Sequence, residues 1–322
     1  MDLTLLLLLS WGILLLIIGY ALCFIQNKKL ARLLSWGIII STTIFSVLVS
    51  QDKPALYRMI TIVSLQLISM KSIVMVETYS GKPQLTIFQW LCFATTWFGM
   101  RPKLFEALVS KPLDGIGALL FKSLSRIAFG FFLLFISTKT EELYIDHFYI
   151  SDLLMLAGMS FILHFGILNL STLAWRIFGV NLNELFISPY KSKSLKEFWG
   201  KRWNMAFSEM TSLIVYKPLI GKVGKATAMI AAFLVSGILH EIAISLPAQA
   251  GYGLPLLFFV IHAIGMTLER QVNFVKTITE HKIYARIWVY AWLLLPMPLL
   301  FHPSFLELVI RPLRAILLGF WS

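Results

Sequence analysis

The sequence is poor in charge and in cysteine. Only 14% of its 322 residues are Asp, Glu, Lys or Arg, against about a quarter in an average soluble domain. The two cysteines, Cys23 and Cys92, lie inside apolar segments, which excludes a disulfide framework and a cysteine-rich metal site. Glycine-rich phosphate loops, G-x-S-x-G elbows and C-x-x-C pairs are absent as well. A serine hydrolase with a nucleophile elbow is therefore excluded.

Apolar residues are abundant instead. They make up 58% of the chain, and runs of roughly 20 of them recur along its whole length. A bilayer accepts such side chains but not unpaired backbone groups, so each run should form a helix. The sequence predicts an all-α, polytopic integral membrane protein with one domain over residues 1–322. Nine spans are predicted, at residues 3–25, 33–49, 57–76, 115–137, 150–175, 226–246, 253–268, 285–301 and 305–320.

Some segments need separate comment. Residues 3–25 are too long for the apolar part of a cleaved signal peptide and follow Asp2 rather than basic residues, so we expect a retained span. Residues 85–99 are too short to cross about 30 Å of hydrocarbon, and we expect them to be re-entrant or interfacial. Arg58 and Lys71 lie near the ends of the third span and should snorkel to the surface.

The net charge of +12 comes from Lys and Arg that lie mostly in short loops between the spans. Such loops favour anionic lipid headgroups or a phosphorylated substrate over nucleic acid. Residues 27–32 and 176–225 are basic, whereas residues 138–150 are acidic through Glu141, Glu142 and Asp146. The positive-inside rule then predicts an outside N-terminus and an inside C-terminus.

Residues 176–225 form the longest interval without a span. From Leu195 to Ile214 the apolar residues fall on one half of a helical wheel, and Lys201, Asn204, Ser208 and Thr211 fall on the other. This pattern predicts an amphipathic helix at the cytosolic interface, with an ion pair between Arg202 and Glu209. Taken alone, the periodicity is typical of an ordinary interfacial anchor.

Three histidines lie within predicted spans, where ionisable residues are costly and often functional. His240 is followed by Glu241 and preceded, at steps of four, by small residues (Ala228, Ala232 and Ser236). Such a stripe admits a neighbouring helix or lines a narrow tunnel. An imidazole can take and return a proton near neutral pH. His164 and His262 lack an acidic neighbour, and we interpret both as packing residues.

Two of these segments resemble a known family. The string SLKEFWGKRWN at residues 194–204, followed by SGILHE at residues 236–241, is similar to the signature of the wax synthase branch of the membrane-bound O-acyltransferases. Pro189–Tyr190 and the FFVIHAIG string around His262 are also similar to this branch. The resemblance covers about residues 185–265.

The resemblance implies an enzyme of lipid metabolism that moves an acyl group from acyl-CoA to the hydroxyl of a hydrophobic alcohol. His240 would be the general base, and Asn204 would position the acyl carbonyl and donate a hydrogen bond to the oxyanion. The remaining motif residues are expected to bind substrate: Trp199, Lys201, Arg202, Trp203, Ser236, Glu241 and His262. Acyl-CoA is then a co-substrate, and no cofactor or metal is expected.

Two alternatives remain open from the residues themselves. An acyltransferase acting on a glycan or a protein would need a polar funnel on the outer face, and the outside loops are short. A lipid or proton-coupled transporter would show paired, Gly- or Pro-broken spans, and no such pairing is evident. The expected partners are acyl-CoA, the alcohol and membrane lipids, in a bacterial inner membrane or the endoplasmic reticulum.

Overall fold

The computed structural model of the chain describes residues 3–143 and 148–319, so Asp2, Asp146 and Phe320 lie outside the described residues. Every regular element in these two ranges is helical, which confirms the predicted fold class. Seven helical stretches in them are long and apolar enough to cross a membrane. They are Leu3–Phe24, Lys28–Ser50, Ala55–Tyr79, Ile116–Thr140, Ile150–Ile177, Met205–Ala248 and Lys282–Leu300.

The predicted count of nine spans is therefore not reached. The segment predicted at 253–268 is the helix α12 (Leu254–Gln271), which ends in the charged pair Glu269–Arg270 and is not among the seven. The segment predicted at 305–320 is divided into a π-helical turn and the short helix α17 (Arg311–Gly319). Arg311 and Arg314 interrupt its apolar run.

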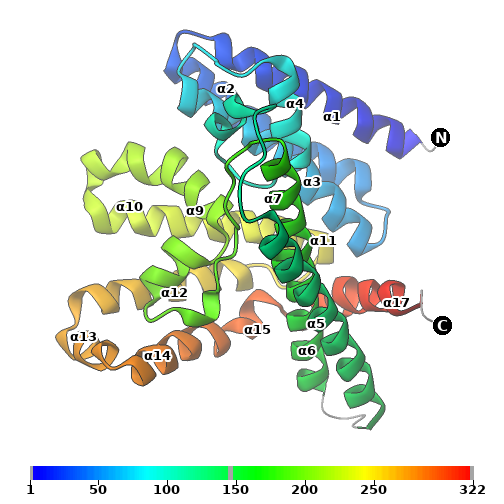
Figure 1. The fold of residues 1–322 in the computed structure, drawn as a ribbon, viewed down its shortest axis with the longest axis vertical. Coiled ribbons are helices and arrows are strands. Elements are labelled where there is room, and N and C mark those ends of the chain that lie inside the picture. Colours follow the sequence, from blue (N-terminus) through cyan, green and yellow to red (C-terminus); the bar gives the residue numbers. More distant parts are fainter. Residues whose placement is uncertain (1–2, 144–147, 320–322) are drawn as a thin grey trace.

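The first three helices pack on one another. They are α1 (Leu3–Ala21), α2 (Lys28–Ser50) and α3 (Ala55–Tyr79), and they occupy the top of the view in Figure 1. The side chain of Asn27 caps α2 by accepting hydrogen bonds from two backbone N–H groups. Serine and threonine lie at the buried face of α2, where small side chains allow close helix packing. α3 is the most buried of the seven stretches.

Lys71 was predicted to snorkel to the surface, and this prediction is wrong. Its side chain is fully buried on α3 and donates hydrogen bonds to the carbonyl oxygens of Trp97 (2.8 Å) and Gly99 (2.5 Å). These carbonyls belong to the loop after α4 (Ile87–Thr96), the short apolar helix predicted as re-entrant or interfacial. An unpaired charge inside a protein is costly, so the pairing fixes this loop against α3.

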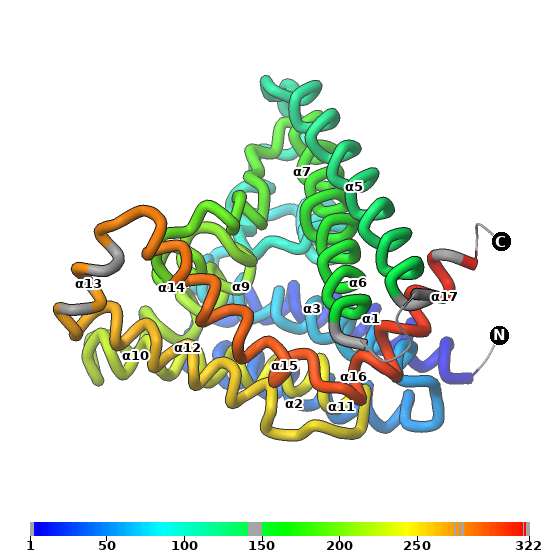
Figure 2. Tube along the Cα trace, turned by 90° about the horizontal axis from the view of Figure 1, so that it is seen from below, coloured from blue at the N-terminus to red at the C-terminus, as the bar shows by residue number. Residues whose placement is uncertain are grey.

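α5 (Ile116–Leu143) packs against α6 (Phe148–Ile162) and α7 (Leu168–Ile177), and Figure 2 shows them as a column rising from the remaining helices. Two glycines permit the close contact of α5 and α6. A Cβ atom on Gly130 would lie 2.7 Å from the carbonyl oxygen of Gly158. Any residue with a side chain at position 130 would therefore displace the backbone.

The amphipathic segment is not the single helix that the periodicity predicts. It consists of α8 (Leu195–Glu197), a π-helical turn, a break at Trp203 and Asn204, and α9 (Met205–Thr211). A second π-helical turn then leads into α10 (Lys217–His240), which is kinked at Gly224, where φ is 79°. The break changes which side chains share a face, because the wheel assumed an uninterrupted helix.

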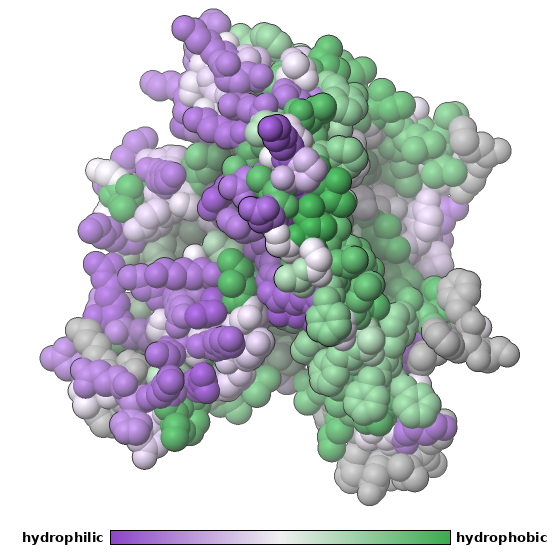
Figure 3. All heavy atoms as spheres, viewed as in Figure 1, coloured by the Kyte–Doolittle hydropathy of each residue, from purple (hydrophilic) through white to green (hydrophobic). Residues whose placement is uncertain are grey.

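The surface is divided between two kinds of residue. In Figure 3, hydrophilic residues gather on the side where α9, α10, α12 and α13 (Asn273–Glu280) lie, and apolar residues cover the side of α5, α6 and α7. The segment with the family-like motif therefore lies at the hydrophilic side, as expected for a segment at a membrane interface.

Candidate active site

The motif begins with a tightly held N-terminal turn. The Ser194 hydroxyl caps α8 by accepting a hydrogen bond from the Glu197 N–H (3.0 Å). Glu269 of α12 accepts hydrogen bonds from the backbone N–H groups of Leu195 (2.6 Å) and Lys196 (3.2 Å), and one from the Trp288 indole. Burial raises the pKa of the Glu269 carboxyl in spite of these three donors. The contact fixes the motif to α12, 74 residues away.

Arg202 pairs with Glu197 rather than with Glu209. Its guanidinium lies 2.6 Å from a Glu197 oxygen, within the first turns of the motif. Glu209 pairs instead with Arg101, at 2.8 Å, in the loop after α4. The predicted Arg202–Glu209 pair is wrong because the break at Asn204 turns α9 away from the preceding turns.

Asn204 has a left-handed backbone, with φ 41° and ψ 66°. Asparagine tolerates this conformation better than most residues. Its side-chain oxygen accepts a hydrogen bond from the Phe207 N–H (3.3 Å) and caps α9. Its Nδ2 has no partner among the residues that the structure describes. The amide is thus oriented by its oxygen, and its N–H groups are available to a ligand.

His240 is the last residue of α10. Its Nδ1 lies 2.7 Å from the carbonyl oxygen of Ser236, one turn earlier. A carbonyl can only accept, so Nδ1 carries the proton and Nε2 carries a lone pair. The ring contacts Phe259 (4.4 Å between centroids) and Phe207 (5.5 Å). This tautomer is the one that a general base requires.

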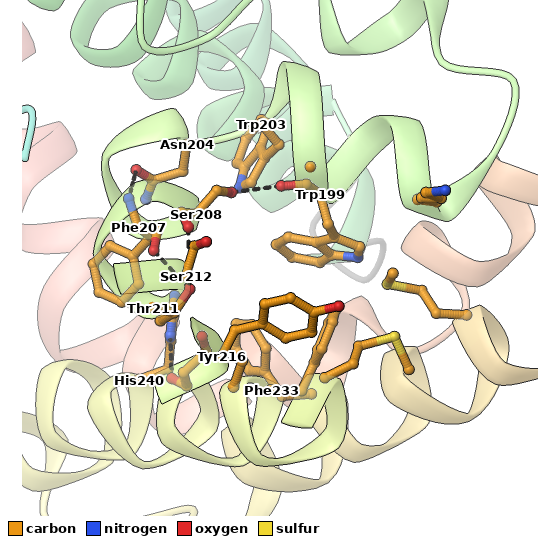
Figure 4. Close-up of a pocket in the computed structure, with 17 residues that line it drawn as sticks. Trp199, Trp203, Asn204, Phe207, Ser208, Thr211, Ser212, Tyr216, Phe233 and His240 are labelled. Carbon is orange, nitrogen blue, oxygen red and sulfur yellow. Dashed lines mark hydrogen bonds between the residues drawn. The ribbon is translucent and has the colours of Figure 1, made fainter. Parts of the chain in front are cut away.

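These residues meet around one cavity of about 220 Å³. Figure 4 shows Asn204 and His240 at the same end of it, on opposite edges, with Phe207 and Thr211 between them and Trp199 at the other end. Five of the nine candidate residues line it: Trp199, Trp203, Asn204, Ser236 and His240. The structure thus brings residues from both halves of the motif around one cavity.

The other four candidates lie outside this lining. Lys201 is exposed, and Arg202 is held in its ion pair. Glu241 accepts a hydrogen bond from the Leu256 N–H (2.9 Å) and links the end of α10 to α12. His262 is fully buried, and its Nδ1 donates a hydrogen bond to the Phe258 carbonyl oxygen (2.8 Å). Its Nε2 has no partner among the described residues, and its ring lies 5.2 Å from the Trp199 ring between centroids.

The remaining mid-span histidine packs as predicted. The His164 ring lies 4.5 Å from that of Phe186 and 5.9 Å from that of Trp203, between centroids. It is not part of the cavity lining.

Several lining residues were not predicted. They include Lys196, Phe207, Ser208, Thr211, Ser212, Tyr216 and Phe259. Ser208 and Thr211 share the polar half of the wheel with Asn204, a half that would face water on an ordinary interfacial anchor. Both residues line the cavity instead. The Ser208 hydroxyl donates a hydrogen bond to the carbonyl oxygen of Trp199 (2.5 Å), and the Thr211 hydroxyl donates one to that of Phe207 (2.8 Å). Lys196 is exposed and lies at the mouth of the cavity.

A basic pocket of about 390 Å³ lies next to this cavity and shares Ser212 with it. Three cationic side chains line the basic pocket: Arg101, Lys103 and Lys217. Arg101 is already paired with Glu209. Lys103 and Lys217 appear in no ion pair with the described residues, so they can bind an anion. No cluster of metal-binding side chains occurs within the described ranges.

Residues 182–261 match the sequence profile of the family described as membrane bound O-acyl transferase. A long-chain-alcohol O-fatty-acyltransferase of Simmondsia chinensis is 31% identical over 140 residues, which are 41% of this chain and 37% of that protein. The probable long-chain-alcohol O-fatty-acyltransferase 6 of Arabidopsis thaliana is 37% identical over 98 residues, 28% of each chain. The acyl-CoA–sterol O-acyltransferase 1 of the same plant is 31% identical over 134 residues, 36% of this chain and 39% of that protein.

The matched segments thus span well under half the length of these relatives. The profile match includes both Asn204 and His240. Together, the long apolar helices and these matches identify an integral membrane protein.

Proposed function

We propose, from the match of residues 182–261 to the membrane bound O-acyl transferase family, that this chain transfers an acyl group from a coenzyme A thioester to the hydroxyl of a hydrophobic alcohol. The observation that carries the proposal is the position of Asn204 and His240 at one end of one cavity. The chain's relatives named for long-chain-alcohol and sterol acylation suggest the class of acceptor.

In this reaction His240 acts as the general base. Its Nε2 lone pair takes the alcohol proton as the hydroxyl oxygen attacks the thioester carbonyl. The tetrahedral intermediate collapses to the ester as the carbon–sulfur bond breaks, and the proton passes from His240 to the departing thiolate. A thioester is already activated, so the two substrates react directly and no acyl-enzyme is needed.

Asn204 stabilises the charge that develops on the carbonyl oxygen. Its Oδ1 is held by the Phe207 N–H, which leaves Nδ2 as a donor of fixed direction. Fixed donors at a developing oxyanion lower the barrier more than mobile ones, because they do not reorganise during the reaction.

The phosphates of acyl-CoA bind, in this proposal, between Lys196 and the basic pocket. Lys196 lies at the cavity mouth, and Lys103 and Lys217 line the pocket that adjoins the cavity at Ser212. Acyl-CoA is supplied from the cytosol, which borders both the endoplasmic reticulum and a bacterial inner membrane. Either membrane therefore fits the proposal. Fractionation of the native cells would decide between these two membranes.

The test is product formation by the purified protein in lipid nanodiscs. Radiolabelled acyl-CoA is supplied with a panel of long-chain alcohols, sterols and terpenoid alcohols, and the lipids are separated by chromatography. We expect labelled ester with at least one alcohol and none with empty nanodiscs. Labelled glycan or protein in place of lipid ester would contradict the proposed acceptor, and absence of any acyl transfer would contradict the activity.

A further inference from the structure

The basic pocket of about 390 Å³ is lined by one residue that does not suit a simple anion site. Arg101 and Lys103 lie at the start of the 3₁₀ helix Pro102–Ala107, and Lys217 begins α10. Glu209 of α9 lines the same pocket, although its carboxylate repels an anion. Three cations and one carboxylate leave this lining with a net formal charge of +2. The presence of the carboxylate is explained by its contact with Arg101.

Glu209 holds Arg101 at the inner nitrogen of the guanidinium. Arg101 Nε lies 2.8 Å from Glu209 Oε1. Arg101 Nη1 and Nη2 donate no hydrogen bond to the residues that the structure describes. The Arg101 side chain is 55% exposed, whereas that of Glu209 is 18% exposed and belongs to a helix. One edge of the guanidinium is therefore anchored to the protein, and the two outer nitrogens remain available to a ligand.

The loop that leads to Arg101 is fixed as well. The buried ammonium of Lys71 binds the carbonyl oxygens of Trp97 and Gly99, just before Arg101. A long side chain normally loses conformational entropy when it is ordered by a ligand. Here the backbone and one edge of the guanidinium are already held, so less freedom is lost on binding. A planar guanidinium in such a position can bind two oxygens of one phosphate at once.

We propose that Arg101 binds the phosphomonoester at the nucleotide end of the coenzyme A donor, and that Glu209 is the positioning residue that orients Arg101. The inference rests on the proposed acyl transfer and adds residues that recognise the donor. Arg101 and Lys103 lie outside residues 182–261, which match the acyltransferase family. The donor site therefore extends beyond the matched segment.

The charge of the basic pocket favours a phosphomonoester over a phosphodiester. A phosphomonoester carries a charge of about −1.5 to −2 at neutral pH, which complements the net charge of the lining, whereas a phosphodiester carries a single charge. The pocket also meets the main cavity at Ser212, at the end of that cavity where Asn204 and His240 lie (Figure 4). A donor with its phosphate in the basic pocket can therefore extend its thioester toward these two residues.

The first test measures the binding of free coenzyme A, which is not turned over, to the protein in phosphatidylcholine nanodiscs by calorimetry. Dephospho-coenzyme A lacks the phosphomonoester and is the matched ligand. We expect wild-type protein to bind coenzyme A about tenfold to hundredfold more tightly than dephospho-coenzyme A, through charge-assisted hydrogen bonds. Equal affinity for the two ligands would overturn the inference.

Arg101→Lys keeps the charge but loses the planar pair of donors. It should weaken the binding of coenzyme A and leave that of dephospho-coenzyme A unchanged, so that most of the difference between the ligands disappears. The control is Lys111→Ala, which removes an exposed lysine that lines neither the main cavity nor the basic pocket. An Arg101→Lys protein with the same preference as Lys111→Ala would contradict the role of Arg101.

Glu209 is tested with two substitutions that both remove its charge. Glu209→Gln keeps an oxygen that can accept from Arg101, whereas Glu209→Leu does not. If Glu209 acts only by repulsion, both variants bind coenzyme A more tightly than wild type. If it orients Arg101, only Glu209→Leu weakens coenzyme A binding, by about threefold to tenfold, without weakening that of dephospho-coenzyme A. Damage to the fold would weaken both ligands, and tighter binding by both variants would overturn the role of Glu209.

Phosphatidic acid separates the donor from a lipid as the source of the phosphomonoester. Its addition to the nanodiscs should change the affinity for coenzyme A by the same factor in wild-type protein and in Arg101→Lys. A loss of affinity confined to wild-type protein would show that a lipid headgroup occupies the site, and would overturn the assignment to the donor.

These binding measurements fail separately from the proposed function, because they need no turnover. If wild-type protein forms ester but binds coenzyme A and dephospho-coenzyme A equally, the phosphate site is wrong and the acyl transfer stands. If wild-type protein forms no ester but prefers coenzyme A through Arg101, the phosphate site stands and the proposed reaction is wrong.

Discussion

Substitution of Asn204 separates its chemistry from its role in the fold. Asn204→Asp keeps the side-chain oxygen that caps α9 and a residue type that tolerates the left-handed backbone. It loses the Nδ2 donor and adds a negative charge beside the developing oxyanion. We expect the free energy of unfolding to change by less than about 0.5 kcal/mol, whereas turnover falls by about 10²–10³.

Two further variants isolate the backbone contribution. Asn204→Ala loses the cap, worth about 1 kcal/mol, and places at φ 41° a residue without the local side-chain hydrogen bond that makes the left-handed region tolerable for asparagine, which costs up to about 1–2 kcal/mol more. Asn204→Gly loses the cap and the donor but relaxes the backbone. Both should lose as much turnover as Asn204→Asp, and only Asn204→Ala should lose substantial stability.

The assay is the esterification rate at saturating acyl-CoA and equal protein level, together with thermal unfolding of the same preparations. An Asp variant that turns over within a few-fold of wild type would refute the role of Nδ2 as an oxyanion donor. Slow turnover that tracks loss of stability across the three variants would show that Asn204 serves the fold alone.

Four other substitutions, with a fifth as a control, test the binding of the donor, the packing of the motif and the buried contact of Lys71 on α3. Lys103→Ala and Lys217→Ala should each raise the KM for acyl-CoA about threefold to tenfold without changing kcat, because a phosphate contact is lost equally in the ground and transition states. Lys201→Ala is the control, since Lys201 is exposed and lines neither cavity. A larger effect of Lys201→Ala on the KM would favour the donor site predicted from the sequence. Arg202→Ala should lower the free energy of unfolding by about 1–2 kcal/mol through loss of its ion pair and of the hydrogen bonds to backbone carbonyls, and unchanged thermal unfolding would contradict this. Lys71→Met should lower it by about 2–5 kcal/mol, since two buried carbonyl groups lose their donor, and a variant as stable as wild type in thermal unfolding would show that water replaces the ammonium.

The long helices could be predicted from the sequence because lipid imposes a simple rule on composition. Runs of apolar residues marked the helices at 28–50, 55–79 and 116–143 to within a few residues at most ends. The predicted start of a span at residue 226 also falls just after the kink at Gly224. Charged residues near the C-terminus misled the count, because α12 and α17 carry charges that shorten their apolar stretches.

The site was harder to predict. The motif identified Asn204 and His240, but a helical wheel cannot show that the helix breaks at Asn204 and turns its polar residues into a cavity. Contacts between distant residues were also beyond the pattern. Glu269 binds the N–H groups of the motif across 74 residues, and Arg101 pairs with Glu209 from a loop that the motif does not include.

The most direct measurement is the esterification rate of His240→Gln beside wild-type protein in nanodiscs. Glutamine is neutral and polar but is no base at neutral pH, so it tests proton transfer rather than packing. We expect a fall of about 10²–10⁴ in turnover with the acyl-CoA dissociation constant unchanged. Turnover within a few-fold of wild type, at equal expression and equal acyl-CoA binding, would contradict His240 as the general base of an acyl transfer.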